Sequence, residues 1–253
     1  MATWSTERKY AYFFAFIVVL VILVGIPVFL LFYKAPTCFD NVQNGNERGI
    51  DCGGSCSRLC PADFSAPRIL WSYSTRVLPG VYNSLAYIQN PNNSVQAASL
   101  SYEFKIYDDQ GILIARRNGT TFVPAGQKFA VFEPSIETGN RIPARTTFEF
   151  TGTPNWVPGT ILSKIHVLDT TLNQGDKPSA EVKVENASVD ESFSNISAFI
   201  ILYDKDDNRV SFSKTVIDSL APTEKTSIYY TWPESFAANI VRTEVIFMKS
   251  SVR

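Results

Sequence analysis

Four cysteines are the residues best placed to do chemistry in this 253-residue chain, and they gather in one short segment. They are Cys38, Cys52, Cys56 and Cys60, with the spacing C-x13-C-x3-C-x3-C. A zinc ribbon needs two close pairs separated by a dozen or more residues, and that pattern is absent. A short Gly- and Asn-rich segment without room for a core is typical of a disulfide-stapled module. We therefore expect two disulfides rather than a metal site or free thiols. The pairing stays open among the three that four cysteines allow.

The acidic and amide residues between these cysteines form a second candidate site. Asp40, Asn44, Glu47 and Asp51 carry the oxygen ligands that Ca²⁺ prefers. Asn and Asp side chains also stabilise turns by hydrogen bonding to nearby backbone groups. We favour the turn interpretation and keep calcium as the alternative.

The cysteine segment resembles a recurrent extracellular motif that reads approximately C-x-D-x-x-x-N-G-x-E-x-G-x-D-C-G-G-x-C. The matching residues are Asn44-Gly45, Glu47, Gly49, Asp51-Cys52-Gly53-Gly54 and Cys56. The sequence departs from the motif at Asn41, where Gly is common, and at Arg48, where Thr is common. The resemblance implies a location outside the cytoplasm and glycines in positive-φ turns.

An uncharged apolar run precedes the cysteines. The stretch 10–33 reads YAYFFAFIVVLVILVGIPVFLLFY. As a helix it would span about 36 Å, enough for a hydrocarbon core of about 30 Å. Aromatic residues at both ends are typical of membrane interfaces. The run exceeds a signal-peptide h-region, and no small-x-small cleavage site follows it, so we expect an uncleaved signal anchor at 10–34.

The direction of insertion rests on the cysteines. Arg8 and Lys9 precede the helix and Lys34 follows it, so the positive-inside bias is slight. Disulfides form outside the cytoplasm. We therefore expect residues 1–9 to be a cytoplasmic tail and everything beyond the helix to be extracytoplasmic.

Composition excludes several classes of function. The net charge is −1 and the pI is near 5.9, so no basic field attracts nucleic acid. His166 is the single histidine, which rules out His-based metal clusters, and its place in an alternating segment favours a structural or surface role. No nucleophile-elbow, phosphate-loop or zinc-protease motif occurs. We expect no catalytic residues, no cofactor and no enzyme activity.

Beyond the cysteines the chain repeats itself with a period of about 96 residues. Residues 69–108 align with 165–204 without a gap, and 145–150 align with 242–247 at an offset of 97. A shared offset over several segments indicates a tandem duplication.

Each repeat reads as short strands separated by turns. Segments 84–90 and 100–107, with their counterparts 179–186 and 196–203, are predicted strands. Strands with turns every 8–12 residues predict an all-β fold of two tandem immunoglobulin- or fibronectin-like β-sandwiches. We expect a cysteine-rich stalk at 35–61, the first sandwich at 62–156 and the second at 157–253.

The sequence Phe104-x-Ile106-Tyr107-Asp108 resembles the motif of the FxLYD family of extracytoplasmic sandwich-like modules. The second copy, Ile200-x-Leu202-Tyr203-Asp204, keeps Tyr-Asp and replaces the Phe. The resemblance implies a fold and a location but no catalytic residues. Within that fold we expect the Tyr to fill a sheet edge and the Asp to open a hairpin turn.

Other surface features have plain interpretations. The acidic run 204–208 is expected to be a solvated hairpin tip, with calcium binding as the minor alternative. Sequons occur at Asn92, Asn118, Asn186 and Asn195 and matter only in a glycosylating host. Trp156 and Trp232 offer a sugar platform if exposed, although their prolines favour interdomain packing.

These features together predict a non-catalytic, membrane-anchored protein of the cell envelope. We expect tandem β-sandwiches that bind or scaffold an envelope protein or a polysaccharide. The alternative is a structural subunit of an envelope or secretion complex, for which Gly25 and Pro27 in the helix are the only hints.

Overall fold

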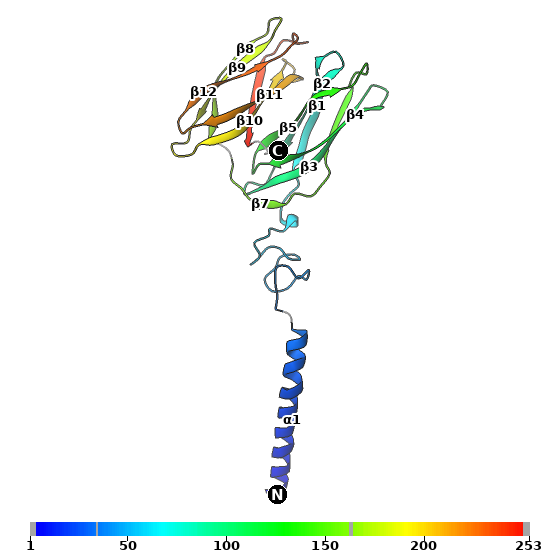
Figure 1. The fold of residues 1–253 in the computed structure, drawn as a ribbon, viewed down its shortest axis with the longest axis vertical. Coiled ribbons are helices and arrows are strands. Elements are labelled where there is room, and N and C mark those ends of the chain that lie inside the picture. Colours follow the sequence, from blue (N-terminus) through cyan, green and yellow to red (C-terminus); the bar gives the residue numbers. More distant parts are fainter. Residues whose placement is uncertain (1–3, 34, 162–163, 250–253) are drawn as a thin grey trace. The chain divides into compact units, whose positions relative to one another are not determined.

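The computed structural model describes residues 4–33, 35–161 and 164–249 and divides the chain into two compact units, Met1–Arg58 and Leu59–Arg253. Among the described residues, the first unit holds one α-helix and the cysteine segment as far as Arg58, and the second unit holds Cys60 and the thirteen strands (Figure 1). The expected all-β fold after one N-terminal helix is confirmed.

Helix α1 spans Trp4–Phe32 and is long and apolar enough to cross a membrane. It begins before residue 10, because Glu7, Arg8 and Lys9 are good helix formers that extend the apolar run by about two turns. Pro27 lies inside the helix, which is the context in which membrane helices tolerate proline. By length and composition α1 is either a membrane anchor or a signal sequence.

The first sandwich joins two antiparallel sheets around one core. Its strands are β1 (Arg68–Leu78), β2 (Val81–Gln89), β3 (Val95–Tyr107), β4 (Leu113–Val123), β5 (Lys128–Glu137), β6 (Arg145–Phe150) and β7 (Trp156–Pro158). The sheet orders are β1-β2-β5 and β4-β3-β6, with β7 paired to β3. A short 3-10 helix, η1 (Pro61–Asp63), precedes the first strand, and Phe64 packs on this core.

The second sandwich repeats this arrangement. Its strands are β8 (Ile165–Asn173), β9 (Ser179–Asn186), β10 (Phe193–Tyr203), β11 (Arg209–Leu220), β12 (Lys225–Thr231) and β13 (Arg242–Lys249). The sheet orders are β8-β9-β12 and β11-β10-β13. Strands β8 to β13 thus correspond in order to β1 to β6, as a tandem duplication predicts, and β7 has no counterpart among the described strands of the second sandwich.

Local sequence explains where the strands end. Asp108 Oδ1 accepts hydrogen bonds from the backbone N–H groups of Gln110 and Ile112, and Asp204 Oδ1 accepts the equivalent bonds from Asp206 and Asn208. Each Asp therefore opens the hairpin that follows its strand, the role expected from the sequence.

The Tyr before each Asp is also used in the same way in both copies. Arg145 lies over the ring of Tyr107 at 4.5 Å, and Arg242 lies over the ring of Tyr203 at 3.7 Å. These cation–π contacts join β3 to β6 in the first sandwich, and β10 (Phe193–Tyr203) to β13 (Arg242–Lys249) in the second.

Two strands are buried on both faces because the sandwiches pack on each other. In β2, Leu85 to Ile88 are all buried, and in β10 every residue from Ile196 to Tyr203 is buried. We name the outward face of β1-β2-β5 face Q1 and that of β11-β10-β13 face P2. Phe132 of face Q1 lies 6.4 Å from Phe199 and 6.1 Å from Phe212 of face P2, measured between ring centroids.

The other two outward faces carry charges instead; we name that of sheet β4-β3-β6 face P1 and that of sheet β8-β9-β12 face Q2. The strand registers place Glu103, Lys105 and Arg116 where face P2 has Phe199, Ile201 and Phe212. Lys105 and Arg116 both form ion pairs with Glu103, at 2.7 and 3.1 Å.

Face Q2 diverges from face Q1 in the same manner. Its β9 residues Glu181 and Lys183 stand where β2 has Leu85 and Tyr87. The two sandwiches are thus apolar on the pair of faces that meet and charged on the other pair.

Candidate functional site

The structure resolves the question that the cysteines raise. Cys38 and Cys56 form a disulfide with Cα atoms 5.6 Å apart, and Cys52 and Cys60 are also disulfide-bonded. No described cysteine is free. The two predicted disulfides are therefore present, and the open choice of pairing is settled for Cys38. A disulfide sulfur has no thiolate to offer a metal.

The acidic residues of the module serve as acceptors for backbone groups. Asp51 accepts hydrogen bonds from the N–H groups of Asp40 and Asn41, at 2.9 to 3.1 Å. Glu47 Oε2 accepts from the N–H groups of Asn44 and Asp51, both at 3.3 Å. A hydrogen bond from the Asn44 side chain, with others from the backbone, lowers the pKa of Asp40. These bonds match the turn interpretation, and calcium binding stays an untested alternative.

One glycine of the motif is required by close packing. Gly54 has φ +63°, and a Cβ atom there would lie 1.6 Å from the carbonyl oxygen of Asn46. No side chain fits that space, so steric packing and the positive φ angle require glycine at this position of the motif.

The remaining residues singled out in the sequence lie apart from one another. His166 is exposed on β8. Trp156 packs 6.1 Å from Phe64, and Trp232 packs 5.1 Å from Phe236, each inside the core of its own sandwich. They are 3% and 9% exposed, so neither forms a sugar platform, and the expected packing between domains is replaced by packing within them.

The four sequons divide into two kinds. Asn186 is fully buried, and its Nδ2 donates to the carbonyl oxygens of Glu191, Leu220 and Ala221. Asn92 is also engaged, since its side chain donates to and accepts from the backbone of Ser65. Asn118 and Asn195 are exposed.

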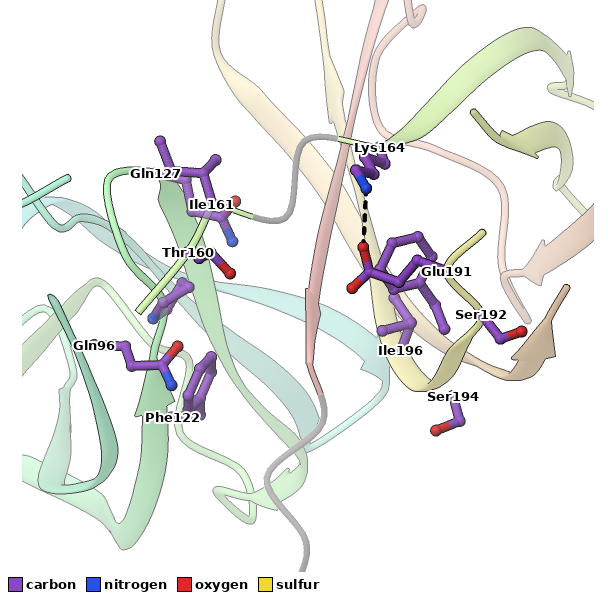
Figure 2. Close-up of a pocket in the computed structure, with 12 residues that line it drawn as sticks. Gln96, Phe122, Gln127, Thr160, Ile161, Lys164, Glu191, Ser192, Ser194 and Ile196 are labelled. Atoms are coloured by element: carbon purple, nitrogen blue, oxygen red, sulfur yellow. Dashed lines mark hydrogen bonds and ion pairs between the residues drawn. The ribbon is translucent and has the colours of Figure 1, made fainter. Parts of the chain in front are cut away.

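A cleft between the sandwiches is the strongest candidate for a binding site. It lies within Leu59–Arg253, has a volume of about 540 Å³ and is drawn in Figure 2. One wall comes from β3, the β4–β5 turn and the segment after β7, and the other from the β9–β10 loop and the start of β10. Its described lining residues are Gln96, Phe122, Pro124, Gln127, Thr160, Ile161, Lys164, Glu191, Ser192, Phe193, Ser194 and Ile196.

The polar groups of the cleft are mostly uncharged. The amides of Gln96 and Gln127 stand on one wall with the hydroxyl of Thr160, and two serine hydroxyls line the other (Figure 2). The Nε2 atom of Gln127 is buried and has no hydrogen-bond partner among the described residues. A buried donor without a partner is energetically costly, and Gln127 itself lines the cleft.

The only charged side chains among the described lining residues neutralise each other. Lys164 and Glu191 form an ion pair at 3.1 Å across the right-hand part of Figure 2. Both side chains are about half exposed, at 48% and 54%. The described lining of the cleft therefore has no net charge.

Sequence reasoning missed the cleft because its lining residues come from at least five separate segments, none of which carries a motif. It also missed the sandwich interface, although a signal for that was present. The run Ala198–Leu202 is apolar at every position, and an uninterrupted apolar strand is typical of burial on both faces.

A shared carboxylate joins the sandwiches beside the aromatic contacts. The hydroxyl groups of Tyr87 and Tyr203 both donate to Glu244, the latter at 3.1 Å. Burial, followed by the negative charge of Glu244, raises the pKa of Tyr203 to about 12, and burial with the Glu244 bond also raises the pKa of Tyr87. Both hydroxyls thus stay protonated donors at neutral pH.

Comparisons with known proteins assign no family. No family model and no curated protein matches the chain, so the FxLYD resemblance stays a prediction. Among solved structures the chain is similar to red sea bream transglutaminase, at 11% identity and a TM-score of 0.24. That match covers 74% of this chain and 29% of the transglutaminase chain. A likeness at this level carries no conclusion about activity.

Proposed function

We propose that this protein is a non-catalytic binding or scaffold protein of the cell envelope, anchored in the membrane by α1 and presenting its two sandwiches outside the cytoplasm. The observation that carries the proposal is the disulfide-bonded module directly after the apolar helix. Structural disulfides belong to oxidising compartments, which supports an extracytoplasmic location for the chain beyond α1.

The paired sandwiches support a scaffolding role. Face P2 buries Phe199, Ile201 and Phe212 against face Q1, and the Tyr87–Glu244 bond ties the same surfaces. An apolar contact of this kind, with a hydrogen bond across it, favours movement of the two sandwiches as one body. Such a body holds the cleft between its two walls in a fixed geometry, which lowers the ordering cost of binding a partner.

Photo-crosslinking in intact cells tests this function. A photoreactive amino acid at Asn118, which is exposed on β4, reports partners of the first sandwich, and one at Phe14 in α1 reports partners in the membrane. A binding protein is expected to give adducts with envelope material at Asn118 and lipid adducts at Phe14.

Two outcomes oppose the proposal. Adducts of the Asn118 probe with cytoplasmic proteins alone would place the sandwiches on the other side of the membrane. Protein adducts of defined mass at Phe14 would instead favour a structural subunit of an envelope or secretion complex.

A further inference from the structure

We propose that the cleft of Figure 2 binds a neutral saccharide chain. This inference rests on the proposed function and names the class of ligand for it. It follows from the charge, the hydrogen-bonding groups and the strand pairing of the cleft walls.

The charge of the cleft favours a neutral ligand. Lys164 and Glu191 are paired with each other, so an anionic or cationic ligand would have to separate them without gaining a free counter-charge. A carboxylate, phosphate or amine therefore finds no net attraction among the described lining residues. A neutral polar ligand leaves this ion pair intact.

The polar groups of the cleft match hydroxyl groups. Each saccharide hydroxyl donates one hydrogen bond and accepts others, and a Gln amide does both as well. Gln96 and Gln127 present two such amides on one wall, with Thr160 between them and the ring of Phe122 beside Gln96 (Figure 2). The ring gives the apolar C–H face of a pyranose a surface to pack on.

Strand pairing in the walls disfavours an extended peptide as the ligand. A peptide that adds to a sheet needs an open strand edge. At Gln96, β3 is paired with Val157 of β7 on one side, and its neighbour Ala97 is paired with Val123 of β4 on the other. On the opposite wall β10 pairs with β13 only from Ile196 onward.

The edge left on β10 is short and irregular. It covers Phe193, Ser194 and Asn195, and Asn195 has φ +53°, which interrupts the extended backbone. A strand of ordinary length of about five residues cannot be continued there. The cleft thus offers side-chain hydrogen bonds rather than a backbone ladder.

The test is binding of neutral oligosaccharides to the full-length protein in nanodiscs, measured by saturation-transfer NMR and calorimetry. The probes are gluco-, chito- and malto-oligosaccharides, with uronate oligomers and a neutral peptide library beside them. We expect at least one neutral series to bind. Gln127→Ala should weaken that binding about three- to tenfold, and Gln96→Ala/Gln127→Ala tenfold or more.

Gln110→Ala is the matched control, because Gln110 is exposed in the β3–β4 hairpin, away from the described cleft lining. It should leave binding unchanged. Glu191→Gln should shift preference toward uronate oligomers, because it frees Lys164 from its partner. Thermal unfolding of each variant shows that it is folded.

The inference is overturned if no neutral series binds, if only the uronates or peptides bind to the unaltered protein, or if the glutamine variants bind as tightly as Gln110→Ala. Such a result, with extracytoplasmic crosslinks at Asn118 still present, would exclude a neutral saccharide as the ligand without contradicting the proposed binding function.

Discussion

Replacing Phe212 by Ala should separate the stabilities of the two sandwiches. Phe212 is 1% exposed, and it packs in the cluster that holds the first sandwich's core rather than in the second sandwich's own core. Its ring meets Phe132 edge-on at 6.1 Å. Truncating a buried Phe costs about 3–5 kcal/mol, from lost burial and the cavity left behind.

Arg116→Ala is the matched control, since the strand registers place Arg116 at the position on face P1 that Phe212 occupies on face P2. The Arg116 side chain is 54% exposed and pairs with Glu103 at 3.1 Å. An exposed ion pair contributes about 0–1 kcal/mol, so this variant should change the free energy of unfolding by no more than that.

The assay is urea unfolding of the full-length protein in detergent micelles. Tryptophan fluorescence reports the first sandwich when Trp156 is kept as the single tryptophan, and the second when Trp232 is kept. The unaltered protein should unfold its sandwiches in one transition, and Phe212→Ala should lower the midpoint and split the signals of the two sandwiches. The reasoning is refuted if Phe212→Ala costs no more than Arg116→Ala and both sandwiches still unfold together.

Three further perturbations test separate features. Asn186→Ala should lower the free energy of unfolding by about 1–3 kcal/mol, because it leaves buried carbonyl groups without a donor. Asn118→Ala, at an exposed sequon, should change it by no more than about 0.5 kcal/mol. Denaturant unfolding of both variants measures the difference. The side-chain and backbone bonds of Asn208 lower the pKa of Asp204 in the folded state, so the stability from Asp204 is present above its unfolded pKa and is lost as pH falls through the folded pKa. Thermal melts between pH 6 and pH 2 should therefore fall less steeply for Asp204→Asn, and equal slopes would contradict this. The pKa of Tyr203 is raised to about 12, so its contribution is present below the unfolded tyrosine pKa of about 10 and is lost as pH rises through the folded value. Spectrophotometric titration should find one late-ionising tyrosine fewer in Tyr203→Phe.

Much of the fold can be predicted from the sequence, because the internal repeat and the alternation of polar and apolar residues are both visible in short segments. The predicted strands at 100–107 and 196–203 are confirmed within β3 and β10, each of which begins a few residues earlier than expected. The earlier starts follow from polar residues such as Gln96 and Ser194, which pair in the ladder although they interrupt the apolar pattern. Pairing satisfies backbone groups whatever the side chain is.

The contacts between sandwiches are harder to predict, because periodicity reports which residues share a face and not what covers that face. Leu85 and Glu181 occupy the same position in their repeats. Only their difference in polarity indicates that the first face packs against another domain and the second is exposed to solvent. The Cys38–Cys56 pairing is likewise set by the turns at Asp40, Glu47 and Asp51, whose geometry the spacing alone does not give.

The cleft is the feature that the sequence predicts least well. Gln96 and Gln127 come from one repeat, and Glu191 comes from the other, so they meet only after both sandwiches have folded and packed. The amide Nε2 of Gln127 is buried without a partner among the residues that the structure describes, and burial of that atom is a property of the tertiary structure.

The most direct test of the central claim is thiol alkylation with mass spectrometry on the protein in native membranes, with and without reductant. An extracytoplasmic module predicts that all four cysteines resist alkylation until they are reduced, and that a non-reduced digest contains the Cys38–Cys56 linked peptide. Free alkylation of all four cysteines without reductant would place the sandwiches in the cytoplasm and contradict the account.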